Sequence, residues 1–190
     1  NQFVNDFNWK SKKWLNSFGV ENYFEGLVKT VNYEAKKTTD YKNDTTNTEA
    51  HAALGYFAKL GLYKEDIINK NFYSLTPKIL LRYAPGHMRN VEAGRLNYGN
   101  LFNLNKVNEL DVVESGLSTS IGFEYKKNKL NKKNKIEDQV LSVSAGQVIS
   151  AEENMDIPAS TSLDQHFSDI VGEAKYSYNN KLNLNYNFSL

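Results

Sequence analysis

The feature that most constrains this chain is the alternation of apolar and polar side chains in its C-terminal segment. In residues 181–190, every second position holds Leu, Tyr or Phe, and Asn or Ser stands between most of them. Successive side chains of a β-strand point to opposite faces of the sheet, whereas a helix would scatter both sets around its axis. The segment is therefore predicted to be a strand with one dry and one wet face.

The same period of two recurs upstream and extends the prediction to a sheet. Residues 117–125 place Leu117, Ile121 and Phe123 opposite Ser118, Ser120 and Glu124, and residues 141–146 and 170–176 alternate in the same way. Weaker alternation predicts further strands at about 3–14, 20–36, 50–62 and 75–83. In total we expect about eight strands, all antiparallel.

The connections between these strands differ in length. Residues 17–19 and 179–180 predict tight turns, whereas residues 84–113 and 150–166 form long loops. Short turns at one end and long loops at the other are typical of an outer-membrane barrel. Residues 63–74 and 126–138 fall on the short-turn side without being tight, and this counts mildly against the pattern.

Alternation alone does not distinguish a membrane barrel from a soluble β-sandwich. Three details favour the barrel: strand lengths near those that cross a bilayer, Tyr and Phe near strand ends, and small polar residues on the wet face. We predict an all-β fold, an antiparallel up-and-down transmembrane β-barrel segment, with residues 1–190 in a single barrel domain. Hydrocarbon offers backbone groups no hydrogen-bond partners, so the outer strands of this barrel segment would pair with segments outside this chain. By itself, the chain would be an open curved sheet.

Composition excludes several classes of protein. The formal net charge of +1 provides no field that attracts nucleic acid, and the absence of cysteine excludes disulfides and thiolate metal sites. The longest apolar runs, such as residues 52–58, are too short for a membrane-spanning helix. The first six residues show no secretory signal, so we expect a fragment or a processed chain.

Other chemistry has weaker support in the sequence. His51, His87 and His166 lack zinc-ligand spacing, so loop or rim histidines are favoured over a metal site. Residues 152–156 are rich in oxygen ligands but lack the Gly and distal Glu of a calcium loop, which favours a solvated loop. The basic run 126–135 has no interleaved aromatic residues, so a solvated turn is favoured over phosphate or nucleic-acid contact.

Arg82 and Arg89 flank Pro85-Gly86 and allow two interpretations. They would anchor a phosphate at the membrane rim, or they would form ordinary ion pairs at the base of a loop. The second interpretation is favoured.

An ordered set of short motifs runs through residues 75–190. A strand with a central proline, Leu75–Pro85, precedes Asn100-Leu101-Phe102 in a loop and Glu114-Ser115-Gly116 at the next strand, and Ser144–Val148 and Ser168–Glu173 follow. This succession resembles the C-terminal barrel half of the lipopolysaccharide-assembly family LptD/OstA, and residues 1–74 fit as preceding barrel strands. The family's N-terminal periplasmic domain is expected to lie outside these residues.

The resemblance implies transport without catalysis. Members receive lipopolysaccharide from a periplasmic bridge of proteins and release it into the outer leaflet of the bacterial outer membrane, with a lipoprotein plug inside the barrel. The implied partners are therefore lipopolysaccharide, the plug, the bridge proteins and outer-membrane lipid. No enzymatic activity, cofactor or metal is expected.

The wet faces supply the candidate site residues. Hydroxyls, amides and carboxylates in a lumen can hydrogen-bond sugars without fixing one ligand tightly. The lumen-facing candidates are Ser118, Ser120, Glu124, Asp169, Glu173, Asn183, Asn185 and Asn187.

The signature loop Asn100, Leu101 and Phe102 is the second candidate. Two apolar residues in a polar loop are best explained if the loop folds back and buries them in the barrel mouth or against the plug. Core packing alone would look identical.

Two other functions stay open at this point. A diffusion porin or nutrient-uptake barrel would also have a polar lumen. A soluble β-sandwich that binds sugars or proteins would suit the near-neutral charge and the abundant tyrosine.

Overall fold

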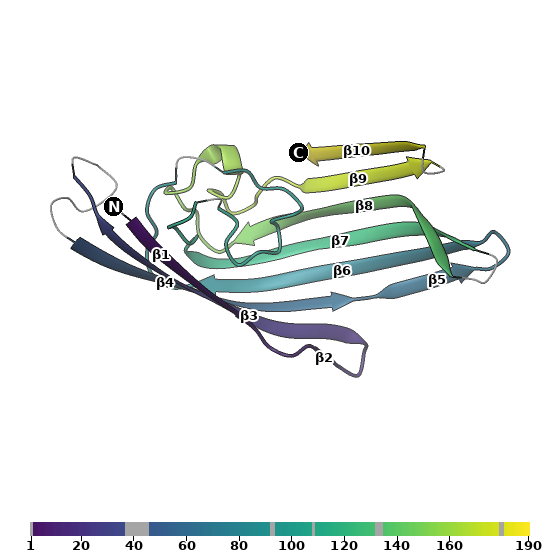
Figure 1. The fold of residues 1–190 in the computed structure, drawn as a ribbon, viewed down its shortest axis with the longest axis horizontal. Coiled ribbons are helices and arrows are strands. Elements are labelled where there is room, and N and C mark those ends of the chain that lie inside the picture. The colour runs from purple at the N-terminus through teal and green to yellow at the C-terminus, as the bar shows by residue number, and fades with distance from the viewer. Residues whose placement is uncertain (1, 37–45, 92–93, 108, 132–134, 179–180) are drawn as a thin grey trace.

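One antiparallel sheet organises the computed structural model, which describes all residues except 1, 37–45, 92–93, 108, 132–134 and 179–180 (Figure 1). The main strands follow the order β1-β3-β4-β6-β7-β8-β9-β10, while β2 pairs with β3 and β5 with β6. Their bounds are β1 Gln2–Lys10, β2 Trp14–Leu15, β3 Val20–Glu34, β4 Thr46–Leu60, β5 Leu62–Asp66, β6 Asn71–Ala84, β7 Gly116–Leu130, β8 Ile136–Ser150, β9 Val171–Tyr178 and β10 Leu182–Ser189. The predicted all-β antiparallel open sheet is confirmed.

Helical structure is minimal in the described part of the chain. A single 3-10 turn, Ala159–Thr161, interrupts the connection between β8 and β9. In the described residues, no helix has both the length and the apolar character that a membrane span requires.

Strand register places most of the exposed apolar side chains of the main strands on one face of the sheet. Directly paired residues of antiparallel strands point to the same face, so rows can be followed from strand to strand. One row crosses β1 to β7 and another crosses β6 to β10. These rows are Trp9, Gly26, Leu54, Tyr83 and Leu117, and Pro77, Phe123, Ala145, Gly172 and Phe188. We call this surface, defined by these two rows and their same-parity neighbours, the apolar face.

The opposite surface, the polar face, carries the alternate residues. Its two corresponding rows are Lys10, Glu25, Gly55, Arg82, Ser118 and Ser150, and Thr76, Glu124, Ser144, Glu173 and Asn187. The alternation that predicted individual strands thus holds in register across the sheet.

Several strands are longer than predicted, and this corrects the expected connections. β7 runs to Leu130 instead of residue 125, and β6 begins at Asn71 instead of residue 75. The connections predicted at 63–74 and 126–138 therefore shrink to residues 67–70 and 131–135. For the connection at 67–70, the prediction that it is not tight was wrong, because polar strand ends beyond the alternating core resemble a loop in the sequence.

Two local breaks refine the predicted strands. The segment predicted as one strand at 3–14 is divided into β1 and β2, which both pair with β3. The β4–β6 ladder stops at Lys59 and resumes with the β5 pair Leu62–Leu75, so the gap of Leu60 and Gly61 falls opposite Pro77 and Thr76. Proline has no backbone N–H to donate, which accounts for the gap.

The turns and loops segregate to opposite ends of the sheet (Figure 1). At Asn16–Val20, the Asn16 side-chain oxygen accepts hydrogen bonds from the backbone N–H groups of Phe18 and Val20, and Gly19 has a φ of 77°. A left-handed residue closes such a turn most easily when it is glycine. The tight turn predicted at 179–180 lies outside the described residues.

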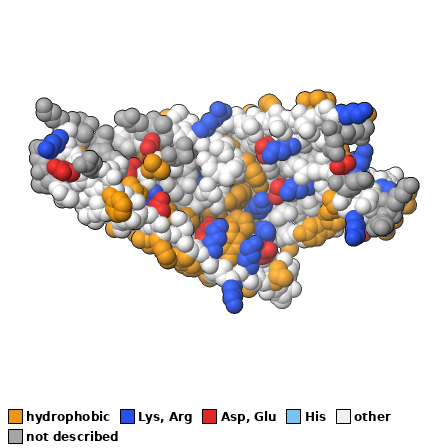
Figure 2. All heavy atoms as spheres, viewed as in Figure 1, with side chains coloured by type: hydrophobic (Ala, Val, Ile, Leu, Met, Phe, Trp, Pro, Cys, Tyr) orange, Lys and Arg blue, Asp and Glu red, His pale blue; other side chains and the backbone are white. Residues whose placement is uncertain are grey.

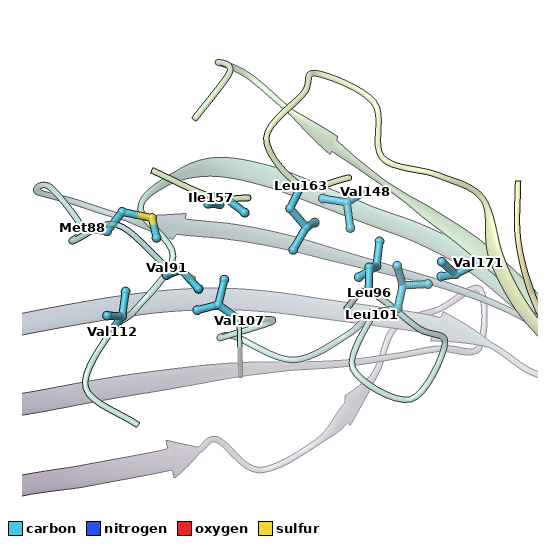
Figure 3. Packing of buried hydrophobic residues seen from close by; sticks show 10 residues of the cluster. All are labelled: Met88, Val91, Leu96, Leu101, Val107, Val112, Val148, Ile157, Leu163 and Val171. Atoms are coloured by element: carbon cyan, nitrogen blue, oxygen red, sulfur yellow. The ribbon is translucent and has the colours of Figure 1, made fainter. Parts of the chain in front are cut away.

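The buried core lies between the polar face and two long connections, residues 85–115 and 151–170, which we call the long loop and the second loop. The main cluster gathers side chains from both loops onto Val148 of β8 and Val171 of β9 (Figure 3). A smaller cluster joins Leu104 and Val113 of the long loop to Leu27, Ala53 and Ala84. Both loops therefore fold back over the sheet.

Candidate functional site

The polar face brings the predicted site residues onto one surface. Ser118, Ser120 and Glu124 lie on β7, Glu173 lies on β9, and Asp169 immediately precedes β9. Asn183, Asn185 and Asn187 lie on β10 and pair with the polar-face residues of β9. All of these residues except Asp169 are placed on the polar face by strand register.

Their surroundings divide them into two groups. Ser118 and Ser120 are buried, and neither hydroxyl forms a hydrogen bond with any described residue. The three asparagines of β10 are exposed, and Asp169 accepts a hydrogen bond of 2.7 Å from the Ser189 hydroxyl. The serines are thus covered, while β10 leaves its amides accessible.

Charges of both signs alternate over the polar face (Figure 2). Lys78 and Lys126 flank Glu124 at 3.1 and 2.8 Å, and Lys175 lies 2.8 Å from Glu173. At the other side of the sheet, Lys10 pairs with Glu25 and Lys29 with Asp6, each at 2.9 Å. A surface with this density of ion pairs is stable only where water reaches it.

The long loop sits on three polar-face glycines. A Cβ atom added at Gly146 would lie 2.4 Å from Leu101, and one at Gly55 would lie 2.6 Å from Leu104. At Gly122, which pairs directly with Gly146, the added atom would lie 3.2 Å from Phe102. We call Gly55, Gly122 and Gly146 the glycine seat, because their missing side chains make room for the signature loop.

Within the seat, the signature residues have separate structural roles. Leu101 is fully buried, and Phe102 makes edge contacts with the rings of Phe57 and Tyr98. The Asn100 amide donates to the carbonyl oxygens of Arg95 and Lys106, at 3.0 and 3.3 Å, and so closes the loop on itself. The loop does fold back, and it does so onto the sheet.

A buried charged cluster fastens the base of the long loop. The Arg82 guanidinium donates to the backbone carbonyls of Leu104 and Glu114, and it lies 3.8 Å from the Glu114 carboxylate. Lys106 lies 3.5 Å from the same carboxylate. Two cations thus face one anion in a fully buried site.

The charge balance of this cluster perturbs its titration. Burial lowers the pKa of Lys106 to about 8. The attraction of the Glu114 carboxylate opposes this shift, and the repulsion of the Arg82 guanidinium adds to it. Burial alone would raise the pKa of Glu114, but the Lys106 and Arg82 charges hold it below its usual value. Lys106 therefore carries the surplus charge of the cluster.

Arg89 forms a second anchor with side chains of the sheet and of the long loop itself. It lies 3.4 Å from Glu49 and 3.0 Å from Asp111, and its guanidinium stacks over the Tyr33 ring. The Tyr33 hydroxyl donates to the other Glu49 oxygen at 2.8 Å. Arg82 and Arg89 thus act as loop-base ion pairs, the interpretation favoured from sequence.

Two cavities flank the docked loop on the polar face. One, of about 380 Å³, lies between the loop tip at residues 102–105 and strands β1 and β3. The other, of about 530 Å³, lies between residues 95–99 and strands β9 and β10. The loop therefore occupies the middle of the face and leaves room on both sides.

The histidines and the acidic segment form no metal site where the structure is described. His51 is buried beside Glu49, whereas His87 and His166 are exposed. No group of three or more His, Cys, Asp or Glu side chains with metal-binding geometry occurs among the described residues.

Sequence reasoning missed Lys106, Arg95 and the glycine seat. Lys106 lies only four residues after Phe102 and was therefore visible as a neighbour of the Asn-Leu-Phe signature, and its partner Glu114 stands in the Glu-Ser-Gly motif. Gly55, Gly122 and Gly146 occupy polar positions of alternating strands, which was the available signal for a docked loop.

Comparison with known proteins adds one match. A family model described as LPS transport system D, LptD, matches residues 14–190. None of the curated proteins matches the chain.

Proposed function

Because the chain belongs to the LptD family of LPS transport proteins, we propose that it forms part of an outer-membrane β-barrel that inserts lipopolysaccharide into the outer leaflet. Residues 1–190 would then belong to one barrel domain, whose edge strands β1 and β10 pair with further strands of a larger barrel. The proposed partners are lipopolysaccharide, a lipoprotein plug within the barrel, periplasmic bridge proteins and outer-membrane lipid. The family is one of transport and assembly, and we propose no enzymatic step.

The observation that carries this proposal is the bare apolar face. Phe123 and Leu184 are 40% and 54% exposed, and large apolar side chains on the apolar face of β1, β3, β4, β6, β7, β9 and β10 are similarly exposed. Soluble monomers rarely expose a contiguous apolar surface of this extent, and in a β-sandwich a second sheet would cover it. Acyl chains are the natural partner of such a surface when the opposite face is charged and wet.

The polar face suits the passage of a sugar head group. Asn183, Asn185 and Asn187 offer amides that both donate and accept hydrogen bonds, and the ion pairs of β7 and β9 keep the surface hydrated. We propose that Ser118, Ser120, Glu124, Asp169 and Glu173 face the same lumen. A hydrated lumen keeps the head group from crossing hydrocarbon.

Depletion of the full-length protein tests the proposal in cells. Lipopolysaccharide is expected to accumulate in the periplasm and to fall at the cell surface, measured by surface labelling of intact cells. Normal surface lipopolysaccharide after depletion would contradict the proposed role.

The docked loop distinguishes this function from a diffusion porin. Both loops cover part of the polar face with a packed apolar cluster, which would obstruct an open pore. Single-channel recording of the reconstituted full-length protein is therefore expected to show little current. A large, steady conductance would favour the porin.

A further inference from the structure

The cavity beside β9 and β10 differs in charge from its counterpart beside β1 and β3. Its charged lining consists of Arg95, Lys175 and Glu173, a formal excess of one positive charge. The cavity beside β1 and β3 is lined by Asp6, Glu25, Lys10 and Lys29, which balance. The two sides of the loop thus offer different electrostatic environments.

Among the charged residues that line this cavity, Arg95 has no ion-pair partner in the described part of the chain. Lys10, Lys29, Lys78 and Arg89 of the same region each have a carboxylate partner within 3.4 Å. Over the described ranges, no carboxylate or other acceptor binds the Arg95 guanidinium, which is exposed at the cavity. Across the cavity, the exposed Asn187 amide likewise has no hydrogen-bond partner among the residues described.

The cavity also has a rigid aromatic wall. The Tyr98 hydroxyl donates to the Phe123 carbonyl at 3.0 Å, and its ring meets Phe102 edge-on with Lys78 5.6 Å from its centre. Burial raises the pKa of this hydroxyl, so the side chain stays neutral. A fixed aromatic wall beside free polar groups is a common arrangement in sugar sites.

We propose that this cavity binds an anionic group on a carbohydrate, either a phosphate or a carboxylate. Arg95 supplies a planar guanidinium that can bind two oxygens, and Asn187 binds an adjacent hydroxyl, while Lys175 stays paired with Glu173 at the cavity edge. This inference rests on the proposed function, since lipopolysaccharide carries such groups, and it assigns the head group to the β9–β10 side of the loop.

Photo-crosslinking in the full-length protein tests the assignment. A benzophenone amino acid replaces Asn185, which pairs with Lys175 at the cavity, and a matched one replaces Asn8 at the cavity beside β1 and β3. We expect lipopolysaccharide adducts from position 185, with about a three- to tenfold loss on Arg95→Gln together with Asn187→Ala. Lys181→Gln on the same hairpin is the charge-matched control and should not change the yield, and Arg95→Lys should retain most of it.

The outcomes separate the site from the function. Two results overturn the site and leave the transport role intact. One is adducts at position 8 alone, and the other is a yield at position 185 that Arg95→Gln does not change in a barrel that still assembles. Adducts at neither position overturn both. With purified protein, dephosphorylated lipopolysaccharide that crosslinks as weakly as the Arg95→Gln variant identifies a phosphate, whereas undiminished crosslinking that still requires Arg95 identifies a carboxylate.

Discussion

At the scale of single residues, Leu101 holds the long loop in place. Its side chain is fully buried against Gly146, so truncation leaves a cavity that the flat glycine surface cannot fill. We expect Leu101→Ala to weaken loop docking by about 2–5 kcal/mol. Limited proteolysis of the full-length barrel measures this as faster cleavage within the loop.

Leu110 is the matched control for this prediction. It lies in the same loop but is 80% exposed, so Leu110→Ala should leave the cleavage rate unchanged. Equal rates for both variants would show that Leu101 does not hold the loop.

Lys106 gives the loop base a predictable pH dependence. Its pKa is about 8 in the folded protein and 10.5 in the unfolded chain, so between these values the unfolded chain binds more protons. Stability therefore rises with pH across this window, by at most about 3 kcal/mol from this group. The midpoint of urea unfolding, measured below, within and above the window, tests the sign.

Lys106→Met should remove this contribution while keeping the site filled. The Arg82–Glu114 pair then remains balanced, and a flexible apolar chain of similar length replaces the lysine. If the variant and the natural protein show the same pH slope, another group is responsible.

At the scale of elements, the glycine seat on β4, β7 and β8 determines where the loop docks. The three atoms nearest to a Cβ added at Gly55 belong to the side chains of Leu104, Leu80 and Glu25, so the effect of a larger residue reports on side-chain packing under the loop. We expect Gly55→Val to cost about 1–3 kcal/mol and to release the loop tip.

The same proteolysis assay measures this effect. Ala52→Val adds similar bulk to the same strand on the apolar face, where the side chain is exposed, and should be neutral. Protection that persists in Gly55→Val would mean that the loop docks elsewhere.

Strand faces were predictable from sequence, whereas the docked loop was not. Leu184 and Asn185 belong to opposite faces because alternation is a local property of the backbone. The burial of Leu101, Lys106 and Glu114 depends on strands far away in sequence, and no local pattern encodes those contacts. Strand ends such as residues 126–130 were missed because their polar residues resemble a loop.

At the scale of the whole molecule, the two faces should respond oppositely to a new charge. Leu184→Lys places an ammonium on the apolar face, where exposure to hydrocarbon would cost about 2–4 kcal/mol near the bilayer centre. Asn185→Lys places the same group on the polar face and should be tolerated. The fraction of heat-modifiable, assembled barrel in cells measures both, and equal assembly would contradict a lipid-facing surface.

The isolated chain of 190 residues provides a second whole-molecule test. With the apolar face bare and the edges of β1 and β10 unpaired in the described sheet, we expect aggregation in plain buffer and β-structure in detergent micelles. Light scattering and circular dichroism distinguish these states. A folded monomer without detergent would favour a soluble module.

The in-register alternation of the two faces also limits how the chain can change by insertion and deletion. Loss of one residue inside a strand would exchange the two faces for the rest of that strand, turning charges toward lipid and leucines toward water. Length changes are therefore tolerable in the connections, where the backbone has no face to preserve. Drift in the length of this protein should be confined to them.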